Sequence, residues 1–259
     1  MDICTLHRGT APLLVSLPHD GSLIPDAIAT RMADSARAAP DTDWHVARLY
    51  AFARELGASI LVPRYSRYVV DLNRPPDDTS LYPGQNTTGL CPARQFCGEP
   101  VYRDGQAPPA DEIDRRVAQY WRPYHQALRN ELDRLHAQHG RAVLWEGHSI
   151  KGSELAFLFE GRLPDLNLGT AAGSSCGAAL QARLEAVLGA QSAYDWVANG
   201  RFKGGYITRH YGQPERGIDA VQLEISQRTY MDEATFEYDQ AKAARLQIML
   251  RELLAATLL

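Results

Sequence analysis

The sequence lacks the features that would assign it to several specialised classes of protein. Its 259 residues include no apolar run long enough to span a bilayer, and residues 1–17 have neither the basic start nor the apolar core of a secretory signal. There is no internal repeat and no block of like charges, and the formal net charge is only −4. We therefore expect a cytoplasmic protein that binds neither membranes nor nucleic acids.

Cysteines are also scarce. The four cysteines, at positions 4, 91, 97 and 176, show no Cys-x-x-Cys spacing, which argues against a disulfide framework or a structural zinc knuckle. A Gly-x-Gly-x-x-Gly turn, a Walker loop and a Gly-x-Ser-x-Gly elbow are missing as well. The common dinucleotide, nucleoside-triphosphate and serine-hydrolase sites are therefore not indicated.

What remains is an ordinary globular composition with an alternating pattern of strands and helices. Hydrophobic residues make up 45% of the chain and charged residues 22%. Apolar runs predict strands at 13–17, 59–62, 68–72, 142–145 and 221–226, and helical spacing predicts helices at 42–56, 111–139 (bent at Pro123), 175–188 and 232–258. This order predicts an α/β fold in one domain covering residues 1–259, with a mostly parallel, mixed sheet and helices on both faces.

Three metal-binding residue types follow predicted strands or begin a helix. His19 comes after the first strand, His148 after the strand at 142–145, and Asp43 lies in the first turn of a predicted helix. In parallel sheets such positions meet at the carboxyl edge. Two histidines and one carboxylate leave an open position on zinc, as in hydrolytic sites. The alternative is that each histidine only caps a turn.

Other polar residues suggest a general base and an anion pocket. Glu224, in an otherwise apolar strand, is either a general base or the partner of an arginine such as Arg228 or Arg209. Two basic groups flank loops and either bind a small anionic substrate or form a solvated surface. The first consists of Arg67, Asn73 and Arg74, before a long Pro- and Gly-rich segment at 73–109, and the second of Arg201, Lys203 and Arg209.

Several motifs, in order along nearly the whole chain, resemble those of the N-formylglutamate amidohydrolases. They are Ser16-Leu17-Pro18-His19-Asp20-Gly21, Thr42-Asp43-Trp44-His45, the run from Ser66 to Pro76 with Asp71-Leu72-Asn73-Arg74, Leu81-Tyr82-Pro83-Gly84, Glu146-Gly147-His148-Ser149, Leu166-Asn167-Leu168-Gly169, the segment 199–211, and Gln222-Leu223-Glu224. The stretch 151–159 looks atypical.

The resemblance implies a zinc carboxypeptidase- and aspartoacylase-like fold and a bound Zn²⁺ ion. It implies that Arg67 polarises the scissile carbonyl, that Asn73 and Arg74 grip the substrate's α-carboxylate, and that Glu224 is the general base. Relatives place a glutamate three residues after the first histidine, where this chain has Ser22. The carboxylate ligand is therefore assigned to Asp43, with Asp20 as the alternative.

The implied reaction is hydrolysis of N-formyl-L-glutamate to formate and glutamate, a step of histidine degradation, with Arg201, Lys203 or Arg209 holding the side-chain carboxylate. One alternative is a deacylase or carboxypeptidase-like hydrolase of another N-acyl amino acid. Another is a noncatalytic protein that only binds the anion. The sequence indicates no oligomeric state.

Overall fold

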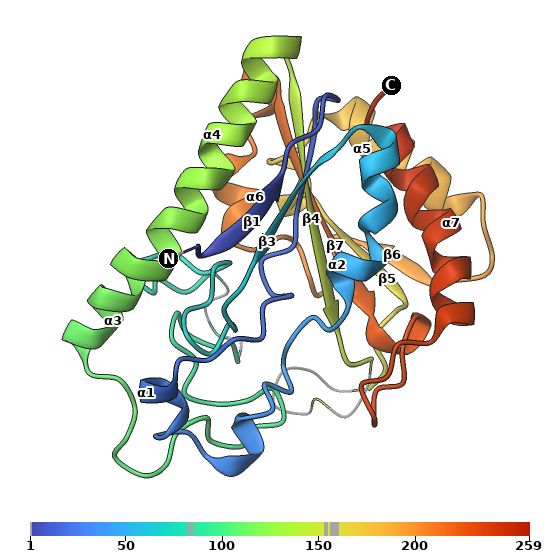
Figure 1. Cartoon of the computed structure of the whole chain (residues 1–259). Helices are drawn as coiled ribbons and strands as arrows, with labels where there is room; N and C mark the ends of the chain where they lie inside the picture. Colours follow the sequence, from blue (N-terminus) through green and yellow to red (C-terminus); the bar gives the residue numbers. More distant parts are fainter. Residues whose placement is uncertain (1, 82–83, 85, 153–154, 156–160) are drawn as a thin grey trace.

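The computed structural model describes residues 2–81, 84, 86–152, 155 and 161–259. In this part of the chain seven strands form one sheet in the order β1-β3-β2-β4-β7-β5-β6 (Figure 1). The strands are β1 (Cys4–His7), β2 (Leu13–Ser16), β3 (Ser59–Pro63), β4 (Ala142–Ile150), β5 (Leu166–Gly169), β6 (Trp196–Ala198) and β7 (Ile218–Ser226). β1 is antiparallel to β3 and β5 to β7, while the other neighbours are parallel. The predicted mostly parallel, mixed sheet is confirmed.

Helices cover both faces of this sheet. In Figure 1, α4 (green) lies on one face and α7 (red) on the other. The helices are α1 (Asp26–Ala29), α2 (Val46–Leu49), α3 (Ala110–Arg116), α4 (Arg122–His139), α5 (Ala178–Gly189), α6 (Tyr206–Tyr211) and α7 (Gln240–Ala256), with 3₁₀ turns at Asp34–Ala36, Ala51–Leu56, Ala171–Gly173, Pro214–Arg216 and Gln227–Thr229. Among the helices in the described ranges, none has the combination of length and apolar character needed to cross a bilayer.

The alternation of side chains along the central strands divides the core into two layers. In β2, Leu13 and Val15 pack in the layer that contains α5 and α7, whereas Leu14 packs in the layer that contains α4. Successive side chains of a strand point to opposite faces, so a strand buried on both sides is apolar throughout. The continuous apolar run of β2 therefore reflects a central position between two helical layers.

The predicted strand at 68–72 is wrong. Residues 68–72 form a buried loop, and side chains supply the hydrogen bonds that a neighbouring strand would otherwise provide. Arg116 donates to the carbonyl of Val69, and His125 donates to the carbonyl of Leu72, at 3.0 and 2.9 Å. Since β-branched residues favour burial as much as strand pairing, their presence here indicated the core and not the sheet.

Three predicted helix starts are also wrong. The helix expected from Thr42 is the short α2, which begins after His45 in the left-handed region (φ 64°) and continues as a 3₁₀ turn to Leu56. The helix expected from residue 232 begins eight residues later, where the Asp239 side chain accepts hydrogen bonds from the backbone N–H groups of Ala241 and Lys242. The helix expected from residue 175 begins at Ala178.

The bend expected at Pro123 is present as a change of helix type. A π-helical turn at Val117–Trp121 connects α3 to α4, directly before Pro123. Proline has no N–H to donate to the carbonyl four residues earlier, so a wider turn relieves the unpaired carbonyl. Tyr82 and Pro83 of the motif at 81–84, and most of the stretch 151–159, lie outside the described residues.

The sequence pattern did not predict β1, β5, β6, α1 or α6, and it ended β4 too early. The strand continues from Trp145 to Ile150, so His148 lies inside β4 and not after it. The two polar residues Glu146 and His148 hid the continuation of the strand, because they are buried although they are titratable.

Candidate active site

The site lies at the carboxyl ends of three adjacent parallel strands, β2, β4 and β7. His19 follows β2 by three residues, and its carbonyl accepts a hydrogen bond from the N–H of Asp43 at 3.1 Å. The register of β4 and β7 places His148 directly opposite Glu224. Chain connectivity and sheet register thus bring together residues that are up to 205 positions apart in the sequence (224 − 19).

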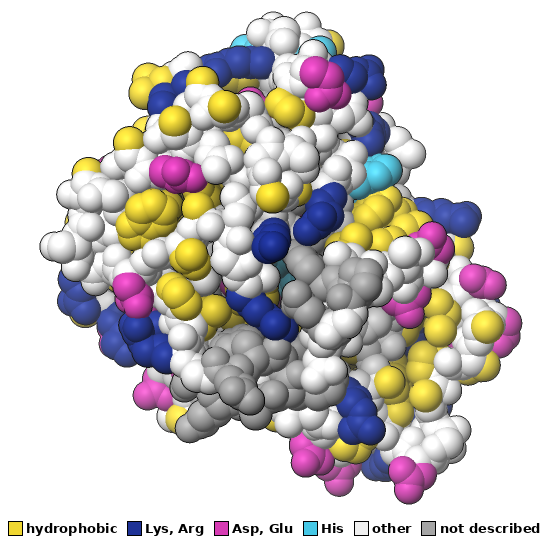
Figure 2. All heavy atoms as spheres, turned by 180° about the vertical axis from the view of Figure 1, so that it is seen from behind, with side chains coloured by type: hydrophobic (Ala, Val, Ile, Leu, Met, Phe, Trp, Pro, Cys, Tyr) yellow, Lys and Arg dark blue, Asp and Glu magenta, His cyan; other side chains and the backbone are white. Residues whose placement is uncertain are grey.

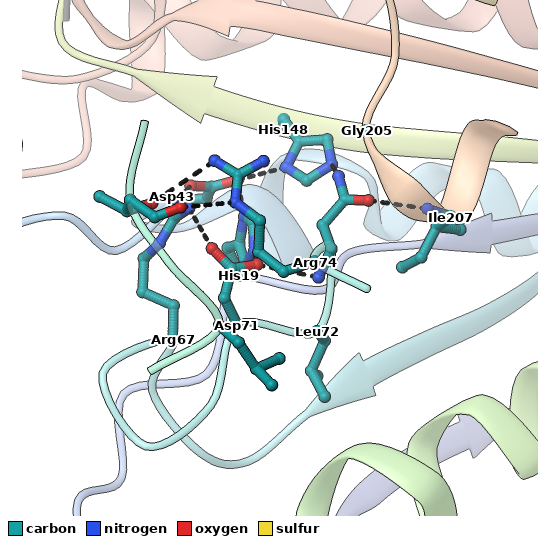
Figure 3. Close-up of polar contacts among 12 residues, drawn as sticks. His19, Asp43, Arg67, Asp71, Leu72, Arg74, His148, Gly205 and Ile207 are labelled. Atoms are coloured by element: carbon teal, nitrogen blue, oxygen red, sulfur yellow. Dashed lines mark hydrogen bonds and ion pairs between the residues drawn. The ribbon is translucent and has the colours of Figure 1, made fainter. Parts of the chain in front are cut away.

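His19, Asp43 and His148 converge on one point (Figure 3). One potential ligand atom from each lies within 4.8 Å of the others. Oδ2 of Asp43 is 3.0 Å from Nδ1 of His148 and 3.7 Å from Nδ1 of His19. All three side chains are buried, at 2 to 4% exposure. Two buried histidines and one carboxylate at this spacing are a donor set suited to holding a divalent cation.

Each histidine has a carboxylate on the side away from Asp43. Nε2 of His19 lies 2.7 Å from Oδ1 of Asp71, and Nε2 of His148 lies 3.2 Å from Oε1 of Glu146. Although burial opposes it, the charges of His19 and Arg67 hold the pKa of Asp71 well below its usual range. Asp71 is thus an ionised acceptor. A carboxylate that is hydrogen-bonded to a metal-binding histidine orients its ring and makes it more basic, and Asp71 does this for His19. Oε1 of Glu146 only forms an ion pair with His148, whose Nε2 is hydrogen-bonded to Asn73 instead.

Nδ1 of His19 provides a test of whether these residues fit a metal. It is buried and has no hydrogen-bond partner among the described residues. Because ionised Asp71 can only accept, Nε2 of His19 must be the protonated nitrogen, and Nδ1 is left with an unused lone pair. A buried acceptor without a partner is costly unless a ligand satisfies it. The residues therefore fit a cation at this position.

A cavity opens beside these ligands. Arg67, Arg74 and Arg201 line it together with Glu224, and Figure 2 shows Lys and Arg side chains gathered around a hollow in one face of the molecule. Three guanidinium groups at one small cavity favour a ligand with more than one carboxylate. Lys203 and Arg209 are not among the described residues that line this cavity.

Two arginines of the cavity, Arg67 and Arg74, are held in place. NH2 of Arg67 donates to Oδ2 of Asp71 at 2.7 Å, and its guanidinium lies under the ring of Phe96, 4.6 Å from the ring centroid. Nε of Arg74 donates to the carbonyl of Thr88 at 2.9 Å, which ties it to the long loop. Arginines fixed in this way bind anions without a further entropic cost.

Asn73 connects the cavity to α6. Its Oδ1 accepts a hydrogen bond from the N–H of Ile207 at 2.9 Å, and its Nδ2 lies 3.0 Å from Nε2 of His148. A Cβ atom at Gly205 would lie 2.3 Å from Nδ2 of Asn73. A glycine is therefore required for the backbone to pass this close to Asn73.

Glu224 is the buried carboxylate of the site. It lines the cavity at 7% exposure, and burial raises its pKa to about 8. A carboxyl group that gains and loses its proton near neutral pH is suited to general acid–base chemistry. Arg228, offered as an alternative partner, instead pairs with Asp165 at 2.6 Å.

The structure thus brings the predicted residues His19, Asp43, Arg67, Asn73, Arg74, His148, Arg201 and Glu224 into one site. Asp20 is not among the described residues that line the cavity or form the metal-binding group, and its Oδ1 accepts a hydrogen bond from the N–H of Ala47 at 2.8 Å. Asp71, Glu146, Gln222 and Phe96 were not predicted as site residues. For Asp71 and Glu146 a signal was available, because each is a carboxylate within a buried apolar run.

The protein has an open, mixed α/β sheet with a basic pocket at its carboxyl edge, beside buried histidines and carboxylates. This architecture and this chemistry define a small-molecule hydrolase. The particular family is given by the sequence. The chain belongs to the N-formylglutamate amidohydrolase family, whose sequence model matches residues 11–231.

Individual relatives agree with this assignment. The chain is 54% identical to the N-formylglutamate deformylase of Pseudomonas aeruginosa and 51% identical to that of Pseudomonas putida, in each case over 99% of this chain and 96% of the relative. The crystal structure of an N-formylglutamate amidohydrolase from Ralstonia eutropha is similar, with a TM-score of 0.84 at 26% identity, over 100% of this chain and 96% of that one. A gene product of Agrobacterium tumefaciens shares the fold, with a TM-score of 0.74 at 17% identity, over 99% and 94% of the two chains.

Proposed function

We propose that this protein hydrolyses N-formyl-L-glutamate to formate and L-glutamate, with one zinc ion held by His19, Asp43 and His148. The names of relatives that are more than half identical over the full chain support the substrate. The observation that carries the mechanism is that these three residues share one cavity with Glu224 and Arg67. We further propose that the reaction is a step of histidine degradation.

The bound ion would lower the pKa of a water molecule and polarise the formyl carbonyl. The chain's own residues supply the rest of the catalysis. The guanidinium of Arg67, held by Asp71, stabilises the negative charge that develops on the carbonyl oxygen. Glu224 takes the proton of the attacking water and returns it to the leaving amine nitrogen.

Substrate binding is assigned to the remaining polar residues of the cavity. Asn73 and Arg74 bind the α-carboxylate, and Arg201 binds the side-chain carboxylate from the opposite loop. Lys203 and Arg209 are not assigned contacts with the substrate. Nε of Arg209 instead donates to the carbonyl of Gly204 at 2.9 Å, so this side chain braces the loop that carries Arg201.

The decisive experiment measures release of formate from N-formyl-L-glutamate before and after removal of metal by a chelator. We expect activity to disappear with the metal and to return when zinc is added. The Glu224→Gln variant should keep its metal and lose a factor of 10² to 10⁴ in kcat, on the order expected for a general base. Full activity in the metal-free protein would reject the mechanism, and a preference for other N-acyl amino acids in a substrate panel would reject the substrate.

A further inference from the structure

A second cavity borders the first, and Phe96, Ser149 and Ile150 line both cavities. Side chains that face two cavities form the wall between them. The far side of this wall is partly polar, because Asp41, Lys151 and Gln227 contribute to the second cavity.

Phe96 is the largest side chain of this wall, and both its backbone and its side chain are held in place. Its backbone N–H donates to Oδ2 of Asp41 at 2.9 Å, and the same carboxylate accepts from the hydroxyl of Tyr68 at 2.7 Å. The side chain packs with Ile150 and Leu155 in a small apolar cluster at 8% exposure. The wall is therefore a fixed surface.

The ring of Phe96 covers Arg67, the residue assigned to the carbonyl oxygen. The guanidinium carbon lies 4.6 Å from the ring centroid. In an N-acyl amino acid, the carbonyl carbon carries three groups: the oxygen, the acyl substituent and the amide nitrogen of the amino acid. With the oxygen at Arg67 and the amino-acid portion bound by Asn73 and Arg74, the acyl substituent takes the remaining direction. A substituent larger than hydrogen would consequently project toward the ring.

We propose that Phe96, supported by Ile150, is the specificity wall that restricts the acyl group to formyl. This inference rests on the proposed function. The wall excludes the methyl group of an acetyl substrate by contact, although unused space lies immediately behind it. Removing the Phe96 side chain joins the two cavities and creates room for a larger acyl group.

The test compares kcat/KM for N-acetyl-L-glutamate with kcat/KM for N-formyl-L-glutamate in the zinc-loaded protein. A pocket distinguishes substrates that differ by one methyl or methylene group by about 10- to 200-fold. We expect Phe96→Ala to raise the acetyl-to-formyl ratio by about 10-fold or more, and Ile150→Ala to raise it less. Some loss of formyl activity accompanies Phe96→Ala, because Arg67 loses its aromatic neighbour.

Phe202 provides a matched control. It lines the first cavity and packs against the same apolar cluster, but it is not among the described residues that line the second cavity. Phe202→Ala should therefore leave the ratio within about twofold of the wild-type value. An equal rise of the acetyl-to-formyl ratio in Phe202→Ala would show that removing any large side chain from the cavity relaxes specificity. That result would overturn the role proposed for Phe96.

The outcomes separate this inference from the proposed function. If the wild-type protein releases formate but the ratio stays unchanged in Phe96→Ala, the wall is overturned and the function stands. If the wild-type protein does not cleave N-formyl-L-glutamate, both are overturned. Should Phe96→Ala fail to fold, Ile150→Ala decides the question by the same ratio.

Discussion

The carboxylate of Asp71 bridges His19 and Arg67. Its Oδ1 lies 2.7 Å from Nε2 of His19, and its Oδ2 accepts a hydrogen bond from NH2 of Arg67 at the same distance. One buried acid thus sets the tautomer of a proposed zinc ligand and the position of the arginine assigned to the oxyanion. Zinc binding by His19 and stabilisation of the oxyanion by Arg67 therefore both depend on Asp71.

Asp71→Asn should weaken metal binding without unfolding the protein. An asparagine amide can donate to Nε2 of His19, which would move the imidazole proton to Nδ1 and block the ligand atom. We expect the zinc dissociation constant to rise about 10- to 100-fold, measured by competition with a chromogenic chelator. An unchanged dissociation constant would show that Asp71 does not orient His19.

The two candidate carboxylate ligands can be separated by substitution. Asp43→Ala removes a ligand and should abolish stoichiometric zinc binding in a folded protein. Asp20→Asn should retain it, because the asparagine oxygen can still accept the hydrogen bond from the N–H of Ala47. Metal content after dialysis measures both. Loss of zinc from Asp20→Asn but not from Asp43→Ala would reverse the assignment.

Arg201 and Lys203 form a matched pair of basic residues in one loop. Arg201 lines the cavity, and Lys203 is not among the described residues that do. Arg201→Ala should raise KM for N-formyl-L-glutamate and lower kcat/KM by about 10- to 100-fold, since charge-assisted hydrogen bonds contribute roughly 1.5–3 kcal/mol. Lys203→Ala should stay within about twofold of wild type. Similar losses in both variants would indicate general electrostatic attraction instead of a contact.

His125 makes stability depend on pH. Burial lowers its pKa to about 3, and its ring stacks on Trp121 with centroids 3.6 Å apart. The folded protein keeps this histidine neutral, whereas the unfolded chain binds a proton below its ordinary pKa of about 6.5. Its stabilising contribution is complete above that pH and is lost as the pH falls toward 3.

His125→Gln should therefore be less stable than wild type at pH 8, and the gap should narrow as the pH falls. Between pH 8 and pH 5 the wild-type protein loses about 2 kcal/mol through this one group, at roughly 1.4 kcal/mol per pKa unit. Urea unfolding of both proteins at the two pH values measures the gap. A gap that does not change with pH would contradict the assignment of a neutral, buried imidazole.

The central sheet and most of the site could be predicted from the sequence because both depend on local patterns. Leu13 to Ser16 form an uninterrupted apolar run with breakers on either side, and His19 follows it directly. Parallel topology then places such residues at one edge. Asp43 was expected in the first turn of a helix that in fact begins later, and the motif resemblance decided between it and Asp20.

What could not be predicted depends on long-range contacts. The buried loop around Val69 has the composition of a strand, but its backbone hydrogen bonds include bonds to side chains far away in the sequence, those of Arg116 and His125. Arg201 and Lys203 look equivalent in sequence, and only the path of their loop decides which of them reaches the cavity. The wall formed by Phe96 lies in a segment whose composition indicates only a loop.

The pairing of His148 with Glu224 across β4 and β7 has a consequence for how activity is lost. A slip of one residue between these strands would put the two side chains on opposite faces of the sheet, so the catalytic geometry cannot degrade gradually. Inactivation by denaturant should coincide with collapse of the central strands, whereas affinity for substrate, which depends on loop arginines, can weaken while the protein is still folded.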